Sequence, residues 1–249
     1  MGTIGQNFHL LASVDSTNNY AMAHVHAGTA WHGDTYFALE QTAGKGQREK
    51  KWVTTAGENI LMSAVLYPAP LLFSDLPLLN MTISLSCYSL LQQFQNEKIK
   101  IKWPNDLYWN DRKAGGILIE NGFQGNRWQF AVAGIGLNIN QTLFPAYLPN
   151  PASLKQALGY DLDVIALAHE LCGLLQTNYQ RLMQGEKAAL LYEYNQALYK
   201  LNQTVKLRQG NIVFPALIEG VDERGSLLVQ SNLAQQFATG EVEWVVEDL

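Results

Sequence analysis

The sequence lacks the features that mark cross-linked, secreted or membrane-spanning proteins. Its 249 residues include two cysteines, Cys87 and Cys172, both in apolar, helix-like stretches, which predicts reduced thiols in a cytoplasmic protein. Prolines and polar residues interrupt the apolar runs before they reach the roughly 20 residues that a membrane-spanning helix needs. Residues 1–14 contain no Lys or Arg and no small-residue cleavage site, unlike a secretory signal. We expect a cytoplasmic protein without a membrane partner.

Charged residues are also few, at 16%, and they are unevenly distributed. Residues 44–52 and 98–113, 25 residues in all, hold nine of the 17 Lys and Arg and only three acidic residues. These two segments therefore carry a net charge of +6, which leaves −11 for the rest of a chain whose total is −5. An acidic body with two cationic segments predicts a local site for an anionic ligand and no general affinity for nucleic acid.

The hydrophobic pattern predicts an α+β fold in which helices pack on a mixed β-sheet. The predicted strands are 8–14, 35–42, 59–67, 99–103, 113–120 and 127–140, and the predicted helices are 17–25, 74–97, 162–182 and 186–199. Residues 43–51 contain no apolar residue larger than alanine, which predicts a mobile loop. After residue 200 short strands at 204–207, 213–219, 226–230 and 240–245 predict a small barrel or sandwich. We therefore expect two domains, 1–199 and 200–249.

Several common catalytic motifs are missing. The sequence has no Gly-x-Ser-x-Gly, and Lys45 is followed by Gly46 where a phosphate-binding loop needs Ser or Thr. The pair His169-Glu170 is followed by Gly173, where a zinc protease helix has its second histidine. The sequence therefore excludes serine hydrolases that use the Gly-x-Ser-x-Gly motif, P-loop nucleoside triphosphatases, and zinc proteases whose metal is bound by two histidines of one helix.

Four segments remain that together define a site. They are the cationic, glycine-flanked loop 44–51, Lys102–Asp106, Lys113–Gly116 and Gly134–Asn138. Each alone is explained by a solvated loop, a turn or a strand irregularity. Taken together, they combine cations for a carboxylate or phosphate, glycines that admit a ligand to the backbone, and an Asp for a magnesium ion. This combination predicts a site for an anion and a nucleotide.

The order and spacing of these segments across most of the chain resemble those of the biotin–protein ligases. The matching segments are Asp15-Ser16-Thr17-Asn18, Gln41-Thr42-Ala43-Gly44-Lys45-Gly46, Lys51-Trp52, Lys102-Trp103-Pro104-Asn105-Asp106-Leu107-Tyr108, Arg112–Glu120 and Gly134–Asn140. The resemblance implies the catalytic fold shared by class II aminoacyl-tRNA synthetases and biotin ligases. Residues 220–229 and 240–242 resemble that family's small SH3-like C-terminal barrel.

The resemblance also implies a two-step acyl transfer that uses ATP and Mg²⁺. The biotin carboxylate attacks the α-phosphorus of ATP to form biotinyl-5'-AMP, and a lysine of a biotin carboxyl carrier protein then attacks this anhydride. Longer members of the family begin with a DNA-binding domain, whereas the Ser-Thr-Asn segment here starts at Ser16, so we expect a ligase that does not bind nucleic acid. Relatives are monomers or homodimers, and the sequence leaves both open.

Site residues follow from the same resemblance. The implied catalytic residues are Lys113, Arg48 and Asp106, with Asp106 as the metal ligand. The implied biotin-binding residues are Ser16, Thr17, Asn18, Gln41, Lys45, Gly46, Gln47, Lys113, Gly115, Gly116 and Gly136. The implied ATP-binding residues are Trp52, Asn105, Asp106 and Asn138.

The loop departs from the family pattern Gly-Arg-Gly-Arg-Arg-Gly-Arg-Lys-Trp. Gln47 replaces an arginine that helps to retain the adenylate, Glu49 replaces a glycine, and Lys45 replaces an arginine, which removes a bidentate contact. Our hypothesis is that Arg48 supplies part of the contact that Gln47 lacks.

Two other functions stay open from the sequence. A lipoate–protein ligase is similar in fold and also activates a carboxylic acid with ATP, although the Lys102–Glu120 segment favours biotin. A single-stranded nucleic-acid-binding module would use residues 45–52 as a basic loop with Trp52 as a stacking platform. The charge of −11 outside the two cationic segments argues against this module.

Overall fold

The structure, a computed structural model, describes residues 2–47, 50–94 and 98–245, and within them the core element is a seven-stranded sheet. Its strands are β1 (Phe8–Val14), β2 (Thr35–Gln41), β3 (Asn59–Leu66), β4 (Ile99–Lys102), β5 (Asp106–Trp109), β6 (Arg112–Gln124) and β7 (Arg127–Asn138). Their order is β1-β2-β3-β7-β6-β5-β4, and β1 and β2 are parallel while the other neighbours are antiparallel. The predicted mixed sheet is confirmed.

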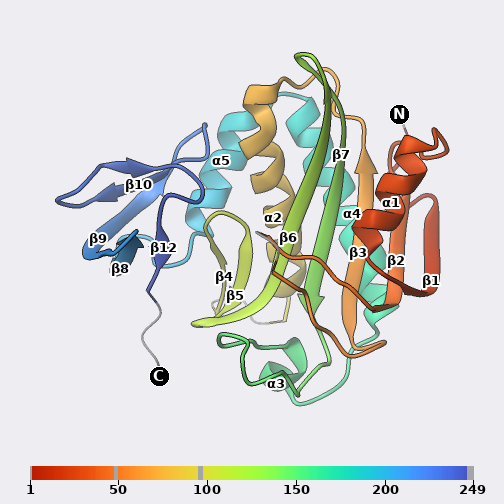
Figure 1. The fold of residues 1–249 in the computed structure, drawn as a ribbon, viewed down its shortest axis with the longest axis horizontal. Coiled ribbons are helices and arrows are strands. Elements are labelled where there is room, and N and C mark those ends of the chain that lie inside the picture. The colour runs from red at the N-terminus through yellow and green to blue at the C-terminus, as the bar shows by residue number, and fades with distance from the viewer. Residues whose placement is uncertain (1, 48–49, 95–97, 246–249) are drawn as a thin grey trace.

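Helices cover both faces of this sheet (Figure 1). The helices α2 (Leu76–Gln92), α4 (Val164–Met183) and α5 (Lys187–Gln196) lie on the back face, and α1 (Thr17–His26) lies on the front. A short helix, α3 (Leu154–Leu158), follows β7. β3 is buried along its whole length, because Met62 packs among the back helices while Val65 packs under α1. Because β3 is covered on both faces, most of its residues are apolar.

Residues after 200 form a second sheet, of five strands in the described part of the chain. It contains β8 (Thr204–Gln209), β9 (Ile212–Val221), β10 (Leu227–Gln230), β11 (Gln236–Phe237) and β12 (Glu243–Trp244), in the antiparallel order β11-β10-β9-β8-β12. Within the described part of the chain, β11 and β12 are the two edge strands, and they do not pair with each other. The sheet is therefore open, and the expected closed barrel is not formed. The physical reason is the shortness of β11 and β12, each of two residues.

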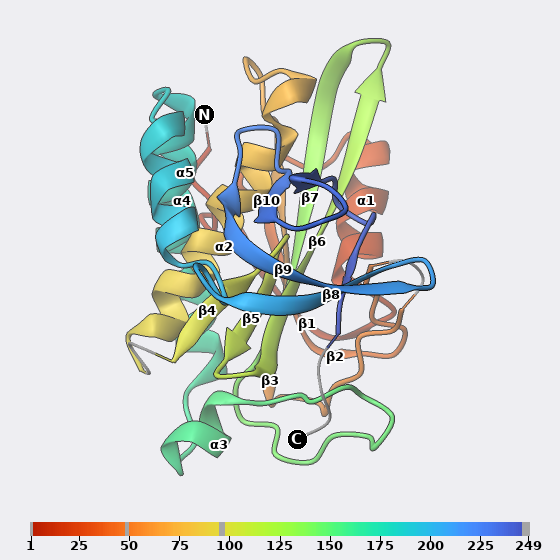
Figure 2. The ribbon, with the colours of Figure 1, turned by 90° about the vertical axis from the view of Figure 1, so that its left-hand side faces the viewer.

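The second sheet is attached to the first by buried contacts. Trp103 Nε1 donates to the Gly225 carbonyl at 3.0 Å, and the Asn195 carboxamide bonds both the N–H and the carbonyl of Val221 at 2.7 and 2.9 Å. Apolar residues of both sheets belong to one continuous core. Figure 2 shows the C-terminal strands beside β4 and β5, next to the front face of the central sheet.

The structure departs from the predicted elements at several places. Helix α2 ends at Gln92 rather than at residue 97, β6 continues to Gln124 rather than ending at residue 120, and β11 was not predicted. Helix α2 begins at Leu76 and not at residue 74, because Asp75 accepts a hydrogen bond from the Leu72 backbone and forms a separate turn. The strand β5 and the helix α3 were not predicted from the sequence. None of the described helices has the length and apolar character of a membrane span.

The described residues of the segment 43–52, called the glycine loop below, pair through their backbone, and the mobility of the loop stays a prediction. Its backbone closes through Gly46 N to Lys50 O at 2.7 Å and Trp52 N to Gly44 O at 2.8 Å. Lys45 and Lys51 form an isolated antiparallel bridge. Backbone hydrogen bonds therefore link these residues where large apolar side chains are absent. Arg48 and Glu49 lie outside the described residues.

Candidate active site

Strand alternation brings the predicted residues together on the front face of the central sheet. On β7, Val132 packs under α1, whereas Ala133 packs among the back helices. Gly134 and Gly136 alternate in phase with Val132 and so face the front. Because these two residues have no side chains, groups from α1 and from the glycine loop can lie directly on the backbone of the sheet.

A buried polar cluster lies where α1 begins. Ser16 is the N-cap residue of α1 and is 1% exposed, yet its side chain makes no capping hydrogen bond. Thr17 donates from its backbone N and its Oγ1 to Gln41 Oε1 at 2.7 and 3.1 Å. Ser63 Oγ lies 2.7 Å from Thr17 Oγ1 and 2.6 Å from Asn18 Oδ1. This cluster, called the α1 polar cluster below, can hydrogen-bond a compact neutral polar group.

The carboxamide of Asn18 is held from several sides. Its Nδ2 donates to the Leu118 carbonyl at 3.2 Å and to Glu120 Oε2 at 2.8 Å. A Cβ added at Gly134 would lie 2.2 Å from Asn18 Oδ1, so only glycine fits beneath it. Ser63 and Glu120 were not among the predicted site residues. The available signal was modest: Ser63 is one polar residue within an apolar part of β3, and Glu120 follows the apolar run 117–119 of β6.

A charged pair lies beside the α1 polar cluster. Lys113 Nζ is 2.7 Å from Asp106 Oδ1, and Asp106 pairs with Gly116 across β5 and β6. A Cβ at Gly116 would lie 3.3 Å from Asp106 Oδ1, so the missing side chain gives room to the pair. Lys113 Nζ also lies 5.8 Å from the ring centroid of Trp52. The pair offers both a fixed cation and a carboxylate to a ligand.

Trp52 covers the sheet at Gly136. A Cβ at Gly136 would lie 2.6 Å from Trp52 Cε2, so the indole rests directly on the glycine backbone. Trp52 Nε1 is buried and has no hydrogen-bond partner among the described residues. An unpaired buried donor costs free energy, so a ligand acceptor at this point would be stabilising.

A chain of carboxamides connects the glycine loop to α2. Gln47 Nε2 donates to Asn105 Oδ1 at 2.9 Å, and Asn105 Nδ2 donates to Asn80 Oδ1 at 3.2 Å and to the Ile117 carbonyl at 3.0 Å. Gln47, Asn80 and Asn105 line a cavity of about 360 Å³ between the central sheet, α2 and the C-terminal sheet. Asn105 therefore faces this cavity rather than solvent.

Other predicted residues lie at the edge of the site. Gly115 faces the core, where a Cβ would lie 2.5 Å from Leu137 Cδ2, so packing is what requires glycine there. Asn138 Nδ2 donates to the Ala152 carbonyl at 3.0 Å and supports the segment after β7. Lys45 Nζ lies 3.5 Å from Glu120 Oε1, and Gly46 closes the loop on Lys50.

Lys102 is a cation of the front face to which the sequence assigned no role. Its Nζ donates to Tyr108 Oη at 2.9 Å and lies 5.7 Å from the ring centroid of Trp244 on the C-terminal sheet. Burial lowers the pKa of Lys102 to about 8, although the nearby Asp106 acts in the opposite direction. Burial likewise raises the pKa of the Tyr108 hydroxyl above its usual range.

The site has one carboxylate suited to a divalent cation. Among the described residues there is no group of three or more His, Cys, Asp or Glu that could hold a metal on its own. Mg²⁺, however, usually takes only one or two protein carboxylates and binds the substrate phosphates as well. Asp106 fits that pattern, because Lys113 contacts its Oδ1 and leaves Oδ2 for a cation.

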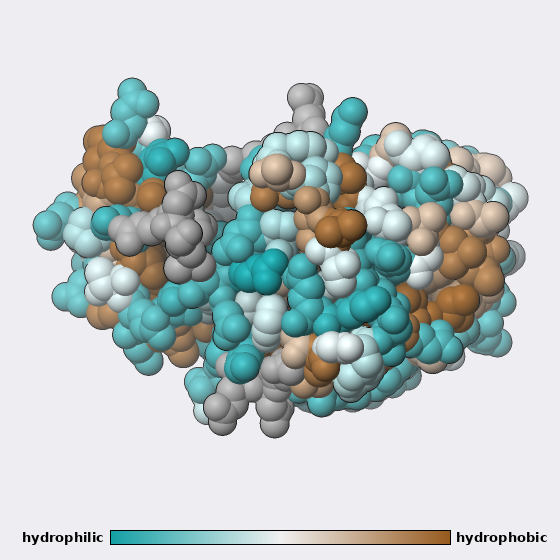
Figure 3. All heavy atoms as spheres, turned by 90° about the horizontal axis from the view of Figure 1, so that it is seen from below, coloured by the Kyte–Doolittle hydropathy of each residue, from teal (hydrophilic) through white to brown (hydrophobic). Residues whose placement is uncertain are grey.

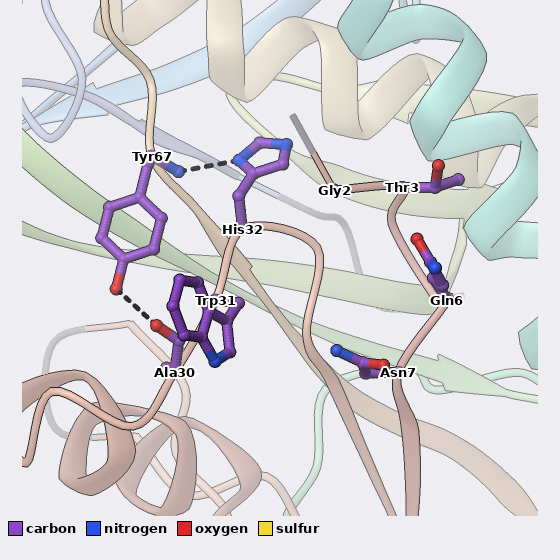
Figure 4. Close-up of a pocket in the computed structure, with 8 residues that line it drawn as sticks. All are labelled: Gly2, Thr3, Gln6, Asn7, Ala30, Trp31, His32 and Tyr67. Carbon is purple, nitrogen blue, oxygen red and sulfur yellow. Dashed lines mark hydrogen bonds between the residues drawn. The ribbon is translucent and has the colours of Figure 1, made fainter.

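A larger cavity, of about 620 Å³, lies elsewhere (Figure 4). It is lined by Trp31, His32 and Tyr67 together with residues near the N-terminus. Figure 4 shows the Tyr67 hydroxyl donating to the Ala30 carbonyl, and the Tyr67 backbone N donating to His32 Nδ1. The lining contains none of the predicted site residues, so this cavity is separate from the site.

Seen from below, the surface of the molecule is mostly hydrophilic at its centre, with apolar patches toward both ends (Figure 3).

Comparison with known proteins agrees with this geometry. The chain superimposes with a TM-score of 0.81 on the solved biotin protein ligase from Aquifex aeolicus in complex with biotin and ATP, at 23% identity over 96% of this chain and 99% of that one. The fold is therefore that of the biotin protein ligases. Residues 10–138 match the biotin/lipoate A/B protein ligase family.

Curated relatives extend the match along the chain. The bifunctional ligase/repressor BirA of Escherichia coli (strain K12) is 30% identical over 243 residues, which cover 96% of this chain and 74% of BirA. The biotin–[acetyl-CoA-carboxylase] ligase of Paracoccus denitrificans is 29% identical over 246 residues, covering 91% of this chain and 95% of that enzyme. This chain belongs to the biotin/lipoate A/B protein ligase family.

Proposed function

We propose that this protein is an ATP-dependent biotin protein ligase, which activates biotin as biotinyl-5'-AMP and transfers it to a lysine of a biotin carboxyl carrier protein. The observation that carries the proposal is the placement of a buried polar cluster next to the Lys113–Asp106 pair on one face of this family's fold. The names of the relatives at about 30% identity favour biotin over lipoate.

In this proposal the α1 polar cluster binds the ureido end of biotin. Ser16 is buried with a hydroxyl that makes no capping bond, and the Gln41 carboxamide uses its Oε1 for Thr17, which leaves its Nε2 for a ligand carbonyl. Asn18 donates both of its amide hydrogens to the protein, so it fixes the cluster and accepts through its Oδ1. A neutral ring with donors and acceptors on both sides suits this set of groups.

Lys113 lies where negative charge develops in both steps. In the first step an oxygen of the biotin carboxylate bonds to the α-phosphorus of ATP, and the bond to the bridging oxygen of pyrophosphate breaks. In the second step the acceptor amine attacks the biotinyl carbonyl, loses a proton and expels AMP. A cation held beside both the carboxylate and the α-phosphate stabilises each transition state.

Trp52, Asn105, Asp106 and Asn138 form the nucleotide side of the site. Trp52 offers an aromatic face for adenine and an unpaired N–H for an acceptor. Mg²⁺ bound with the ATP phosphates would be held by Asp106 and would neutralise part of their charge. Lys45, Gly46 and Gln47 place the backbone of the glycine loop over the ligand, with Gly115, Gly116 and Gly136 in the underlying sheet.

We divide the chain into a catalytic domain, residues 1–199, and a C-terminal domain, residues 200–249, that is SH3-like in its strand content. The buried free thiols Cys87 and Cys172 suit a cytoplasmic enzyme. In this proposal the partner is the carrier domain of a biotin-dependent carboxylase, and the enzyme acts as a monomer or a homodimer.

The experiment that tests the function is incubation with ATP, Mg²⁺ and a biotin carrier domain, supplied with biotin or with lipoic acid. Avidin blotting and intact-protein mass spectrometry of the carrier should show a biotinyl mass shift that depends on ATP. The same reaction with Lys113→Ala should show little transfer. A lipoyl mass shift without a biotinyl one would overturn the proposal.

A further inference from the structure

The cavity of about 360 Å³ between the central sheet, α2 and the C-terminal sheet begins directly beside the Lys113–Asp106 pair. Asn105 lines this cavity, and the next residue, Asp106, lies 2.7 Å from Lys113 Nζ. Among the described residues of the lining, Arg224 is the only charged one, and the others are uncharged polar or apolar. A cavity that is lined by one cation and no carboxylate favours an anionic ligand.

We propose that Arg224 and Asn80 bind the pyrophosphate that ATP releases in the first step, and that this cavity holds it. This inference rests on the proposed function. In that step the bond between the α-phosphorus and the bridging oxygen breaks, and the oxygen keeps the electron pair. The leaving group therefore gains negative charge, which a cation at its side stabilises.

Arg224 belongs to a turn whose place on the cavity wall is fixed. Asp222 Oδ1 accepts from the Arg224 backbone N at 3.0 Å. Gly225 has a φ of +80°, and a Cβ there would lie 2.8 Å from Pro77 Cβ on α2. The Gly225 carbonyl accepts from Trp103 Nε1 at 3.0 Å. The turn is therefore anchored both to α2 and to the segment between β4 and β5.

The guanidinium of Arg224 is available to a ligand. The residue is exposed, and within the part of the chain that the structure describes its guanidinium has no ion pair and no hydrogen bond. A guanidinium presents its N–H donors in a planar fork, which matches two oxygens of a phosphate group. Pyrophosphate suits this donor set, because it offers several charged oxygens within a short length.

Asn80 supplies a second donor from the α2 wall of the same cavity. Its Oδ1 accepts from Asn105 Nδ2 at 3.2 Å, so the orientation of the Asn80 carboxamide is defined. Its Nδ2 makes one long hydrogen bond, to the Pro104 carbonyl at 3.5 Å, and has a second N–H to donate. Asn80 thus adds a neutral donor to the charge of Arg224. Neither residue was among the site residues expected from the sequence.

The test is biotin-dependent exchange of labelled pyrophosphate into ATP by Arg224→Gln, in which the charge is lost and a polar side chain remains. We expect the KM for pyrophosphate to rise about tenfold, as for loss of one hydrogen bond to a charged group. Arg224→Lys should rise less, about threefold, because lysine keeps the charge without the fork. Asn80→Asp keeps the oxygen that accepts from Asn105 but adds a like charge, so its KM should rise at least about tenfold.

The matched control is Arg208→Gln, which removes an arginine from β8 of the same sheet, outside the cavity lining. This variant should keep the wild-type KM for pyrophosphate. If Arg224→Gln had the same KM for pyrophosphate as Arg208→Gln, the inference would be overturned. A rise in the KM for the carrier domain alone would also overturn it, because Arg224 would then serve the acceptor protein.

Failure of the proposed function gives a different result. Wild-type protein that exchanges no pyrophosphate and biotinylates no carrier domain would overturn the proposed function. Calorimetry with pyrophosphate alone still tests the cavity in that case. Wild type and Arg208→Gln should bind pyrophosphate about tenfold more tightly than Arg224→Gln, and equal affinities of the three proteins would overturn the inference.

Discussion

The Lys113 ammonium and the Asp106 carboxylate form an ion pair of 2.7 Å on the front face of the central sheet, one strand away from the backbone of Gly136. Their side chains are about one third exposed, so the pair is open to a ligand from the side of the glycine loop. The positions of both groups are fixed by β5 and β6, which are neighbours in the sheet. A cation on a rigid strand suits transition-state stabilisation, because no reorganisation is needed during the reaction.

Replacement of Lys113 by alanine should lower the rate of adenylate formation about 10²- to 10³-fold, the usual effect of losing one preorganised electrostatic group. The measurement is biotin-dependent exchange of labelled pyrophosphate into ATP. Lys155→Ala breaks a comparable ion pair, with Asp161 at 2.8 Å, and serves as the control. A Lys113→Ala enzyme within a few-fold of wild type would remove Lys113 from the proposed mechanism.

Replacement of Gly134 by alanine should disrupt the α1 polar cluster. The new Cβ would lie 2.2 Å from Asn18 Oδ1, so Asn18 must move away from Ser63. We expect a loss of about 1–3 kcal/mol in the free energy of unfolding, measured with urea. We also expect biotin affinity to fall at least about tenfold, as one to two kcal/mol of lost binding implies.

Gly173 on α4 is the matched control for that substitution. Nothing lies within 4 Å of a Cβ built there, and the residue is inside a helix. Alanine at Gly173 should stabilise the protein by about 0.5–1 kcal/mol, with no change in biotin affinity. Similar effects of alanine at the two glycines would contradict our account of Gly134.

Retention of the adenylate tests the role of Arg48, which the resemblance to the family suggests. Arg48→Ala should release free biotinyl-5'-AMP about fivefold faster than Lys50→Ala, as expected for one hydrogen bond of about 1 kcal/mol. Released adenylate can be trapped in the absence of carrier and measured by liquid chromatography. Equal release from the two variants would show that Arg48 does not compensate for Gln47.

Stability should depend on pH through Lys102, whose pKa burial lowers to about 8 from an ordinary value of 10.5. Between these values the unfolded chain retains a proton that the folded chain has released. The free energy of unfolding should therefore rise with pH across this window. Urea unfolding of wild type and Lys102→Met between pH 7 and 10 should show a smaller rise for the variant. Lys100→Met is the control, because it also removes one cation from β4. The effect of Lys102 is the difference between the two variants.

The identity and order of the site segments could be predicted from the sequence, because short motifs and charge are local properties. The sequence predicted that the cationic loop, the Lys102–Asp106 segment and the two glycine-containing strands form one site, and all of them contribute residues to the front face of the central sheet. The alternation of Val132, Gly134 and Gly136 also follows from the strand period. The backbone hydrogen bonds between the described residues of the glycine loop could not be predicted, since its side chains give no periodicity.

Sequence alone thus determined the α+β class, the strands β6 and β7 that carry Lys113 and the site glycines, and the residue types expected to bind an anion. Only the tertiary structure decided which distant groups meet. Glu120 reaches Asn18 across 102 residues of sequence, and Ser63 reaches the same side chain across 45. The opening of the C-terminal sheet is likewise set by how few residues β11 and β12 pair. Such contacts depend on strand order and register, which local patterns do not encode.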